Sequence, residues 1–179
     1  MRGFFLSIAL LAWLPAAAGA DPRFDGAWTA SLCAKGASRE AGECATFVLE
    51  LMEKDGKLCG AHLFATPGAA RLDEGMAPSV TADIVQATAS GVAISHASGS
   101  AVRVPVELSL EGTQLRWRRL EAPDGASLLP EKATLTRSGK RTLFAPLFEQ
   151  KLRAACTVVF NLAAPDAALP DAATASSKR

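Results

Sequence analysis

Apolar residues recur at every second position over much of this chain, and this alternation constrains the fold more than any other feature of the sequence. It is clearest over residues 101–110, where the apolar members are Val102, Val104, Val106, Leu108 and Leu110. A period of two places alternate side chains on opposite faces of a strand. Seven further segments are predicted as strands on the same grounds: 26–33, 44–53, 57–65, 79–86, 91–97, 113–120 and 131–137. The chain is therefore predicted to be mainly β.

Two turn sequences predict how neighbouring strands pair. Asp55-Gly56 suits a two-residue type I′ turn, because both central residues of that turn need positive φ. The register that follows is Lys54 with Lys57, Met52 with Cys59, Leu49 with His62 and Phe47 with Phe64. Glu111-Gly112 is a weaker signal of the same kind, and it predicts Leu108 opposite Leu115, Val106 opposite Trp117 and Glu107 opposite Arg116.

The period changes after residue 137, where a helix is predicted from Pro146 to about residue 155. Proline is favoured in the first turn of a helix, and a stripe at three- and four-residue spacing follows, formed by Leu147, Phe148, Lys151, Leu152 and Ala155. Residues 157–162 could extend the helix or form a last strand. Eight short antiparallel strands followed by one helix favour a closed up-and-down β-barrel, with a two-sheet β-sandwich as the alternative.

The first twenty residues have the composition of a secretory signal peptide. Arg2 precedes an apolar run of about a dozen residues, and Ala18 and Ala20 form an A-x-A cleavage site before Asp21. We therefore expect a signal peptide at 1–20, one barrel domain with its helix at 21–162, and a disordered tail at 163–179, rich in Ala, Pro, Asp and Ser. The expected location is periplasmic or secreted, and no later segment is expected to span a membrane.

The charge balance argues against nucleic acid as the main partner. The chain has 19 basic and 18 acidic residues, and removal of residues 1–20, which contain only Arg2, leaves 18 of each. Binding to a phosphate backbone needs a basic surplus. Locally, Arg103, Arg116 and Arg118 share the outer face of one predicted hairpin, with Lys132 nearby. They are either a basic patch for an anionic envelope component or a solvated face partly neutralised by Glu107.

The segment Phe24-Asp25-Gly26-Ala27-Trp28-Thr29 contains G-x-W at the start of the first strand, and Asp55-Gly56-Lys57-Leu58-Cys59-Gly60 follows as a hairpin. Together these motifs resemble the opening of calycin-type barrels, the lipocalins and avidins, and that of small secreted bacterial barrels. The resemblance covers mainly residues 24–66. It implies that Trp28 closes one end of the barrel and that Arg137, from the last strand, packs over it.

The four cysteines are predicted to form two disulfides, because export favours an oxidising compartment. If Cys33 lies opposite Cys44, then Trp28 faces Leu49 and Ala30 faces Phe47, which agrees with the apolar pattern. Cys59 lies about 26 Å along the strand from Cys44, beyond the reach of about 7 Å for a disulfide. Cys59 is therefore left for Cys156. That bridge would staple the terminal helix to the barrel wall, which the terminal helix also covers in the barrels this chain resembles.

Large side chains predicted to point inward are candidate ligand contacts: Trp28, Phe47, His62, Phe64 and Trp117. His62 and His96 are the only histidines, and a hydrogen-bonded barrel histidine is expected rather than a metal ligand or acid–base group. Arg71, Asp73 and Glu74 form a compact charged loop, which is the first candidate for a contact surface.

Familiar catalytic and cofactor motifs do not occur in the sequence, so neither an enzyme, a metal site nor a cofactor is predicted. Two functions remain. The first is an exported, non-catalytic barrel that binds a small apolar ligand. The alternative is an envelope protein–protein interaction or inhibitor module that acts through loops at 35–43, 66–78 and 121–130.

We predict that the exported protein begins at Asp21, because signal peptidase cleaves after small residues in the A-x-A pattern. Intact-mass analysis of the exported chain measures this directly. A chain that keeps residue 1 would contradict both export and the oxidising compartment inferred for the cysteines.

Overall fold

The computed structural model of the chain describes residues 23–121, 127–139 and 146–162. The predicted signal peptide and tail lie outside these residues. The strands are β1 (Gly26–Leu32), β2 (Ala45–Lys54), β3 (Lys57–Ala65), β4 (Leu72–Glu74), β5 (Val80–Val85), β6 (Thr88–Ser95), β7 (Val102–Glu111), β8 (Gln114–Arg119) and β9 (Lys132–Arg137). A 3-10 turn, η1 (Pro67–Ala69), precedes β4, and one helix, α1 (Pro146–Leu162), follows β9.

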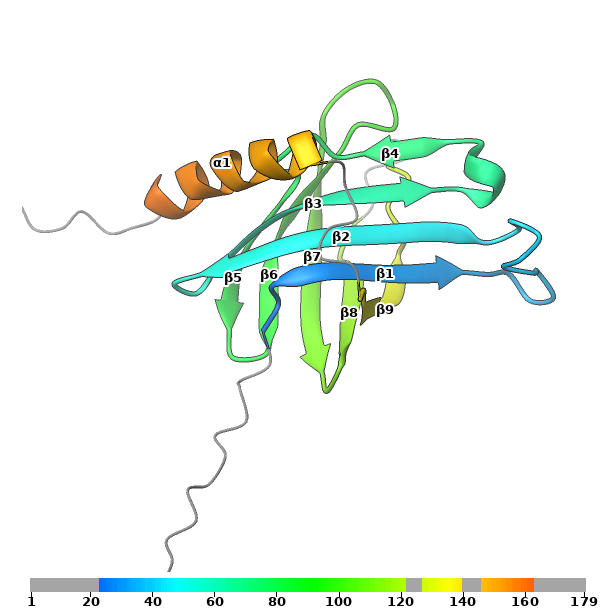
Figure 1. Cartoon of the computed structure of the whole chain (residues 1–179), viewed down its shortest axis with the longest axis horizontal. Coiled ribbons are helices and arrows are strands. Elements are labelled where there is room, and N and C mark those ends of the chain that lie inside the picture. The colour runs from blue at the N-terminus through cyan, green and yellow to red at the C-terminus, as the bar shows by residue number, and fades with distance from the viewer. Residues whose placement is uncertain (1–22, 122–126, 140–145, 163–179) are drawn as a thin grey trace, which may run out of the picture.

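Eight of the strands form a closed antiparallel barrel, which confirms the predicted fold over the sandwich. The order is β1-β2-β3-β5-β6-β7-β8-β9, and β9 pairs back with β1 (Figure 1). Short strand β4 was not predicted, and it pairs with the end of β3 at Leu63–Ala65. It forms there because β3 extends beyond its pairing with β5. That pairing covers only Lys57–Gly60, which leaves the end of β3 free to pair with β4.

The β2–β3 hairpin has the predicted register throughout. Leu49 faces His62 and Phe47 faces Phe64, and the turn residues Asp55 and Gly56 have φ of 50° and 73°. Positive φ at both central positions is what a type I′ turn requires. The local turn signal therefore determined this pairing correctly.

The β7–β8 register predicted from Glu111-Gly112 is wrong by two residues. The turn residues are Gly112 and Thr113, so Leu108 faces Trp117, Leu110 faces Leu115 and Glu107 faces Arg118. Gly112 has a φ of 59°, and glycine at the first central position is typical of a type II′ turn. A shift of two keeps each side chain on its expected face, which is why the apolar pattern did not reveal the error.

The barrel interior is one apolar cluster to which every barrel strand contributes. On β6 the buried side chains are Ala89, Ala93 and Ser95, whereas Val92 and Ile94, the larger apolar residues in the alternation of predicted strand 91–97, are half-buried on the outside. The opposing strand presents Val104, Val106 and Leu108, all fully buried. The inward-facing side chains of β6 are small because the larger side chains of β7 fill the adjacent space.

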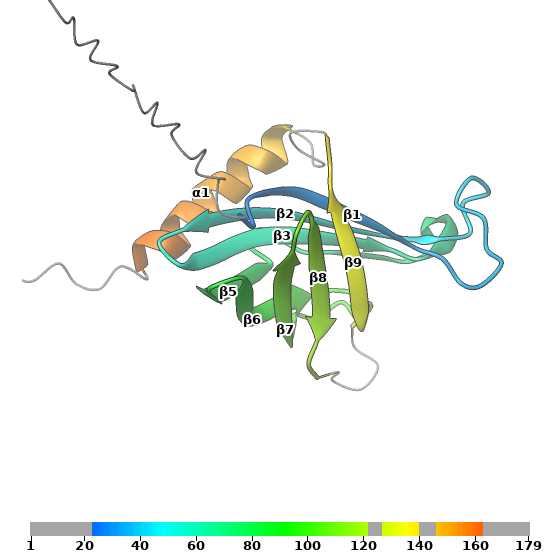
Figure 2. The ribbon, with the colours of Figure 1, turned by 90° about the horizontal axis from the view of Figure 1, so that it is seen from below.

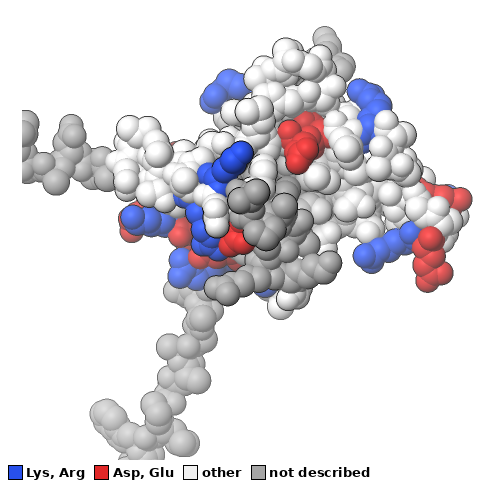
Figure 3. All heavy atoms as spheres, turned by 45° about the horizontal axis from the view of Figure 1, so that its top comes forward, with Lys and Arg blue, Asp and Glu red and all other residues white. Residues whose placement is uncertain are grey.

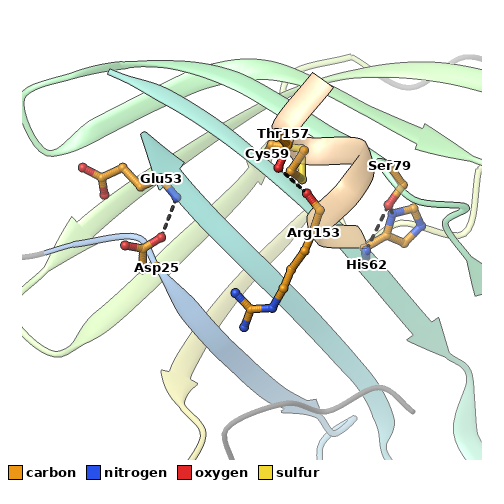
Figure 4. Close-up of a disulfide and its surroundings, with 8 residues drawn as sticks. Asp25, Glu53, Cys59, His62, Ser79, Arg153 and Thr157 are labelled. Carbon is orange, nitrogen blue, oxygen red and sulfur yellow. Dashed lines mark hydrogen bonds between the residues drawn. A yellow bond between two sulfur atoms is a disulfide. The ribbon is translucent and has the colours of Figure 1, made fainter. Parts of the chain in front are cut away.

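Helix α1 lies against the outside of β3 and includes residues 157–162, so these residues extend the helix rather than form a strand (Figure 2). Cys156 therefore lies within the helix, whereas the predicted helix ends at about residue 155 and places Cys156 just beyond it. The predicted Cys59–Cys156 disulfide is present, with the two Cα atoms 5.5 Å apart (Figure 4). Around it lies a second small core of Cys59, Ala61, Leu152 and Cys156, against which Met52 and Phe148 pack.

We predict that Phe47→Ala destabilises the protein by about 3–5 kcal/mol, because it removes a large side chain from a packed interior. Phe47 is fully buried and makes edge-on contacts with Trp117 and Phe64, at centroid distances of 5.0 and 6.2 Å. The matched control is Thr46→Ala, an exposed neighbour on β2, for which a change within about 0.5 kcal/mol is expected. Urea unfolding measures both, and equal midpoints would contradict the assigned inner face.

Candidate functional site

The five candidate ligand residues lie inside the barrel or at its closed end, and all are buried. Their exposed fractions run from 0% to 8%. Trp28 and Trp117 use their indole N–H groups internally, donating to the carbonyl oxygens of Phe24 at 2.8 Å and Pro130 at 3.0 Å. Because aromatic rings contact one another across the interior, these side chains pack as core.

Arg137 lies over Trp28, in the position that the resemblance implied. Its guanidinium carbon is 4.3 Å from the centre of the indole ring, within the range of a cation–π contact. The same guanidinium donates hydrogen bonds to the carbonyl oxygens of Asp25 and Arg23. Gly26 allows this approach, because a Cβ built there would lie 2.6 Å from an Arg137 nitrogen.

His62 belongs to a buried polar cluster at the opposite end of β3 from the Asp55-Gly56 turn. Its ring Nδ1 lies 2.9 Å from the Ser79 hydroxyl, which also accepts the His62 backbone N–H at 3.0 Å (Figure 4). Its other ring nitrogen, Nε2, is 3.5 Å from Asp73 Oδ1 and makes no hydrogen bond to any described residue. The Ser79 hydroxyl has one proton and two acceptor sites, so it can share a hydrogen bond with Nδ1 in either tautomer of the His62 ring.

Asp73 joins three segments that are distant in sequence. Its carboxylate accepts hydrogen bonds from the Ser95 hydroxyl and from the His96 backbone N–H, the latter at 2.9 Å. Burial raises the pKa of Asp73, but the His62 ring, the Ser95 hydroxyl and the His96 amide outweigh burial and lower the pKa from 3.8 to about 2. Asp73 therefore remains ionised and holds β4 against the end of β6.

Ser79, His62 and Asp73 form a hydroxyl–imidazole–carboxylate series, an arrangement that hydrolases use to activate a nucleophile. Here all three are at most 1% exposed, so a substrate has no access to the Ser79 oxygen. The cluster is instead suited to fixing the segment after β4 to the barrel. No signal in the sequence linked Ser79 and Ser95 to His62, because the contacts depend on the sheet order.

The charged loop at 71–74 divides between the interior and the surface. Asp73 is 1% exposed, whereas Arg71 and Glu74 are exposed on either side of it. Within β4, Asp73 points inward because it pairs with the inward-facing Phe64, and its neighbours Leu72 and Glu74 point outward. Of the three predicted contact residues, Arg71 and Glu74 are therefore available to a partner.

Two of the three predicted contact loops meet in one surface, which we call the stapled tip: residues 33–44 and 66–71. The predicted Cys33–Cys44 disulfide closes the first loop, with Cα atoms 4.3 Å apart. The Gly68 N–H donates to the Gly42 carbonyl at 3.0 Å and so joins the two loops. The tip lies at one end of the molecule, beyond β5–β9 (Figure 1). Of the third loop, residues 122–126 lie outside the described part of the chain.

The predicted basic patch on the outer face is crossed by ion pairs. Arg118 contacts Glu107 at 2.9 Å and Arg116 contacts Glu111 at 2.6 Å. A groove of about 410 Å³ lies over this part of β7, β8 and β9. Arg103 lies outside it, further along β7.

Within the described ranges, no group of three His, Cys, Asp or Glu side chains is placed to hold a metal ion. None of the helices in the described part is long and apolar enough to cross a membrane. Comparisons with protein families, with curated proteins and with solved structures found no match to this chain.

We predict that Asp73→Asn destabilises the protein near neutral pH by on the order of 2 kcal/mol, and that this difference narrows as the pH falls from about 4 towards 2. The sign follows from the lowered pKa: the Asp73 carboxylate contributes stability above its ordinary value of 3.8, and that contribution is lost as the pH falls through about 2.

Urea unfolding of wild type and variant between about pH 2 and pH 6 measures this difference. Glu74→Gln removes the neighbouring exposed carboxylate and is the control, for which little change is expected. A difference between wild type and Asp73→Asn that stays constant over this pH range would contradict the role assigned to the Asp73 charge.

Proposed function

We propose that the protein is an exported, non-catalytic interaction module that binds another protein through its stapled tip. One observation supports this proposal above the others: the two exposed loops of the tip are held in one conformation although they contribute nothing to the barrel core. Residues 33–43 are almost all exposed, yet a disulfide closes them and a hydrogen bond ties them to residues 66–71. A loop held in one conformation before binding loses less entropy when it binds.

Internal hydrogen bonds within the tip support the same proposal. The Ser38 N–H donates to Glu43 Oε2 at 2.7 Å, and the Glu43 N–H donates to the Ser38 carbonyl at 3.0 Å. In the second loop, the Arg71 N–H donates to Thr66 Oγ1 at 2.9 Å. Functional contacts are often made by loops that a rigid scaffold positions, and both loops here follow directly from barrel strands.

The composition of the tip indicates what its partner would look like. Its uncharged residues are mostly Ala and Gly, and its exposed charges are Lys35, Arg39 and Arg71 against Glu40 and Glu43. Figure 3 shows side chains of both signs at this end of the molecule. A narrow projection of small residues with a basic excess fits a concave, acidic site on a second protein.

The packed interior favours this function over a small apolar ligand held inside the barrel. Such a ligand would have to separate Phe47 from Trp117 and Phe64, whose rings are in contact. The two disulfides support the exported setting, because such bonds persist mainly in oxidising compartments.

The test compares capture of envelope proteins by the wild type and by Lys35→Glu/Arg39→Glu, which reverses two exposed charges of the tip. We expect one protein to be retained by the wild type and to fall about tenfold or more with the variant, since rim charges govern encounter and specificity. Lys54→Glu/Arg103→Glu makes the same change of charge outside the tip and is the control.

Quantitative mass spectrometry of the retained proteins, followed by binding of the purified candidate, decides the outcome. If every retained protein is held equally by the wild type and the tip variant, the proposal is wrong. A small molecule seen on the wild type by native mass spectrometry, and released when Phe47 is replaced, would instead support an apolar ligand in the interior.

A further inference from the structure

A groove opens where β1 separates from β9. The two strands pair only at Trp28 with Arg137 and at Thr29 with Thr136, so the end of β1 has no partner on β9. Leu32, at that end, lines a groove of about 410 Å³ whose other walls come from β7, β8 and β9, including the buried Trp117 and Ala133. This volume is in the range of sites that hold small organic molecules.

Two cations lie directly opposite each other in this groove. Arg118 on β8 is the cross-strand partner of Lys132 on β9. Like charges opposite each other in a ladder repel and lower stability. The acid that contacts Arg118 is Glu107, from the β7 side, and among the described residues the acid that contacts Lys132 is its chain neighbour Glu131, at 3.9 Å. The side of Arg118 that faces Lys132 therefore lacks a counter-charge among the described residues.

The adjacent row of the ladder adds further donors. Arg116 is paired with Ser109 on one side and Thr134 on the other, and all three line the groove. In the described part of the chain neither hydroxyl is engaged in a hydrogen bond. The lining thus combines three cations with two hydroxyl groups and the carboxylate of Glu107, and Glu111 pairs with Arg116 from outside the lining at 2.6 Å.

We propose that this groove binds a small organic phosphate monoester, with its phosphate between Arg118 and Lys132 and its apolar part against Leu32. A phosphate monoester carries nearly two negative charges at neutral pH and several acceptor oxygens, which match the charge and the donors of the groove. None of the residues that line the groove belongs to the stapled tip, and the site does not depend on the proposed function.

The test titrates the full mature protein with hexyl phosphate and follows binding by calorimetry and by backbone amide NMR. Arg118→Gln and Lys132→Gln should each weaken binding by about tenfold or more, since each removes a charge-assisted hydrogen bond. Arg103→Gln removes an exposed cation of β7 that lies outside the groove, and its affinity should stay within about twofold of the wild type.

Glu107→Gln is expected to increase the affinity for hexyl phosphate, an outcome that a misfolded variant would not produce. It removes the carboxylate that competes for Arg118, at 2.9 Å, so hexyl phosphate should bind several-fold more tightly. Thermal melts of each variant establish that it is folded before titration.

Three further probes separate the parts of the proposal. Inorganic phosphate should bind more weakly than hexyl phosphate because it lacks the contact with Leu32, and hexanoate should bind more weakly because it carries one charge. Hexanol should not bind measurably. Equal binding of hexanoate, no binding of hexyl phosphate, or shifts at amides outside the groove would each overturn the proposal.

Discussion

Closure of the barrel depends on a seam only two residue pairs long, between β1 and β9. Arg137 reinforces this seam, because its guanidinium covers the Trp28 ring and bonds the backbone that leads into β1. The Ser138 N–H adds a bond to the Ala27 carbonyl at 2.7 Å. The first and last strands of the barrel, which are more than one hundred residues apart in sequence, are thus held together at one point. Without that contact β1 and β9 would be open edges, which are prone to pair with other chains.

The short seam also explains why the molecule has an extended end. Beyond Thr29, β1 stays paired with β2 as far as Leu32 but leaves β9, so β1, β2 and β3 continue past the rest of the barrel. The stapled tip is built on this extension, and the groove beside Leu32 occupies the angle that it leaves. Each disulfide has a separate role: Cys33–Cys44 closes the first loop of the tip, and Cys59–Cys156 holds α1 on the opposite part of β3.

Local signals in the sequence predicted the contacts that lie close along the chain or share a strong apolar pattern. The Asp55-Gly56 turn determined the β2–β3 register, and that register in turn left Cys59 for Cys156. The predicted β7–β8 register is wrong because a turn at Glu111-Gly112 and a turn at Gly112-Thr113 place the same side chains inward. The two registers differ by two residues, so the apolar pattern does not distinguish them. The inward face of β6 does not follow its alternation for a different reason, since burial there depends on the volumes of the side chains on neighbouring β7.

The polar cluster shows most clearly what sequence reasoning could not reach. His62, Asp73, Ser79 and Ser95 come from four segments, and they meet because β3 pairs with both β4 and β5 while β5 carries β6 alongside. Burial of a carboxylate costs free energy unless hydrogen bonds satisfy it. Asp73 can therefore be buried only where the Ser95 hydroxyl and the His96 N–H donate to it. That requirement places β4 at the end of the barrel, and η1, directly before it, then lies within reach of the 33–44 loop. The interior cluster and the exposed tip are therefore linked through one short segment, residues 66–74.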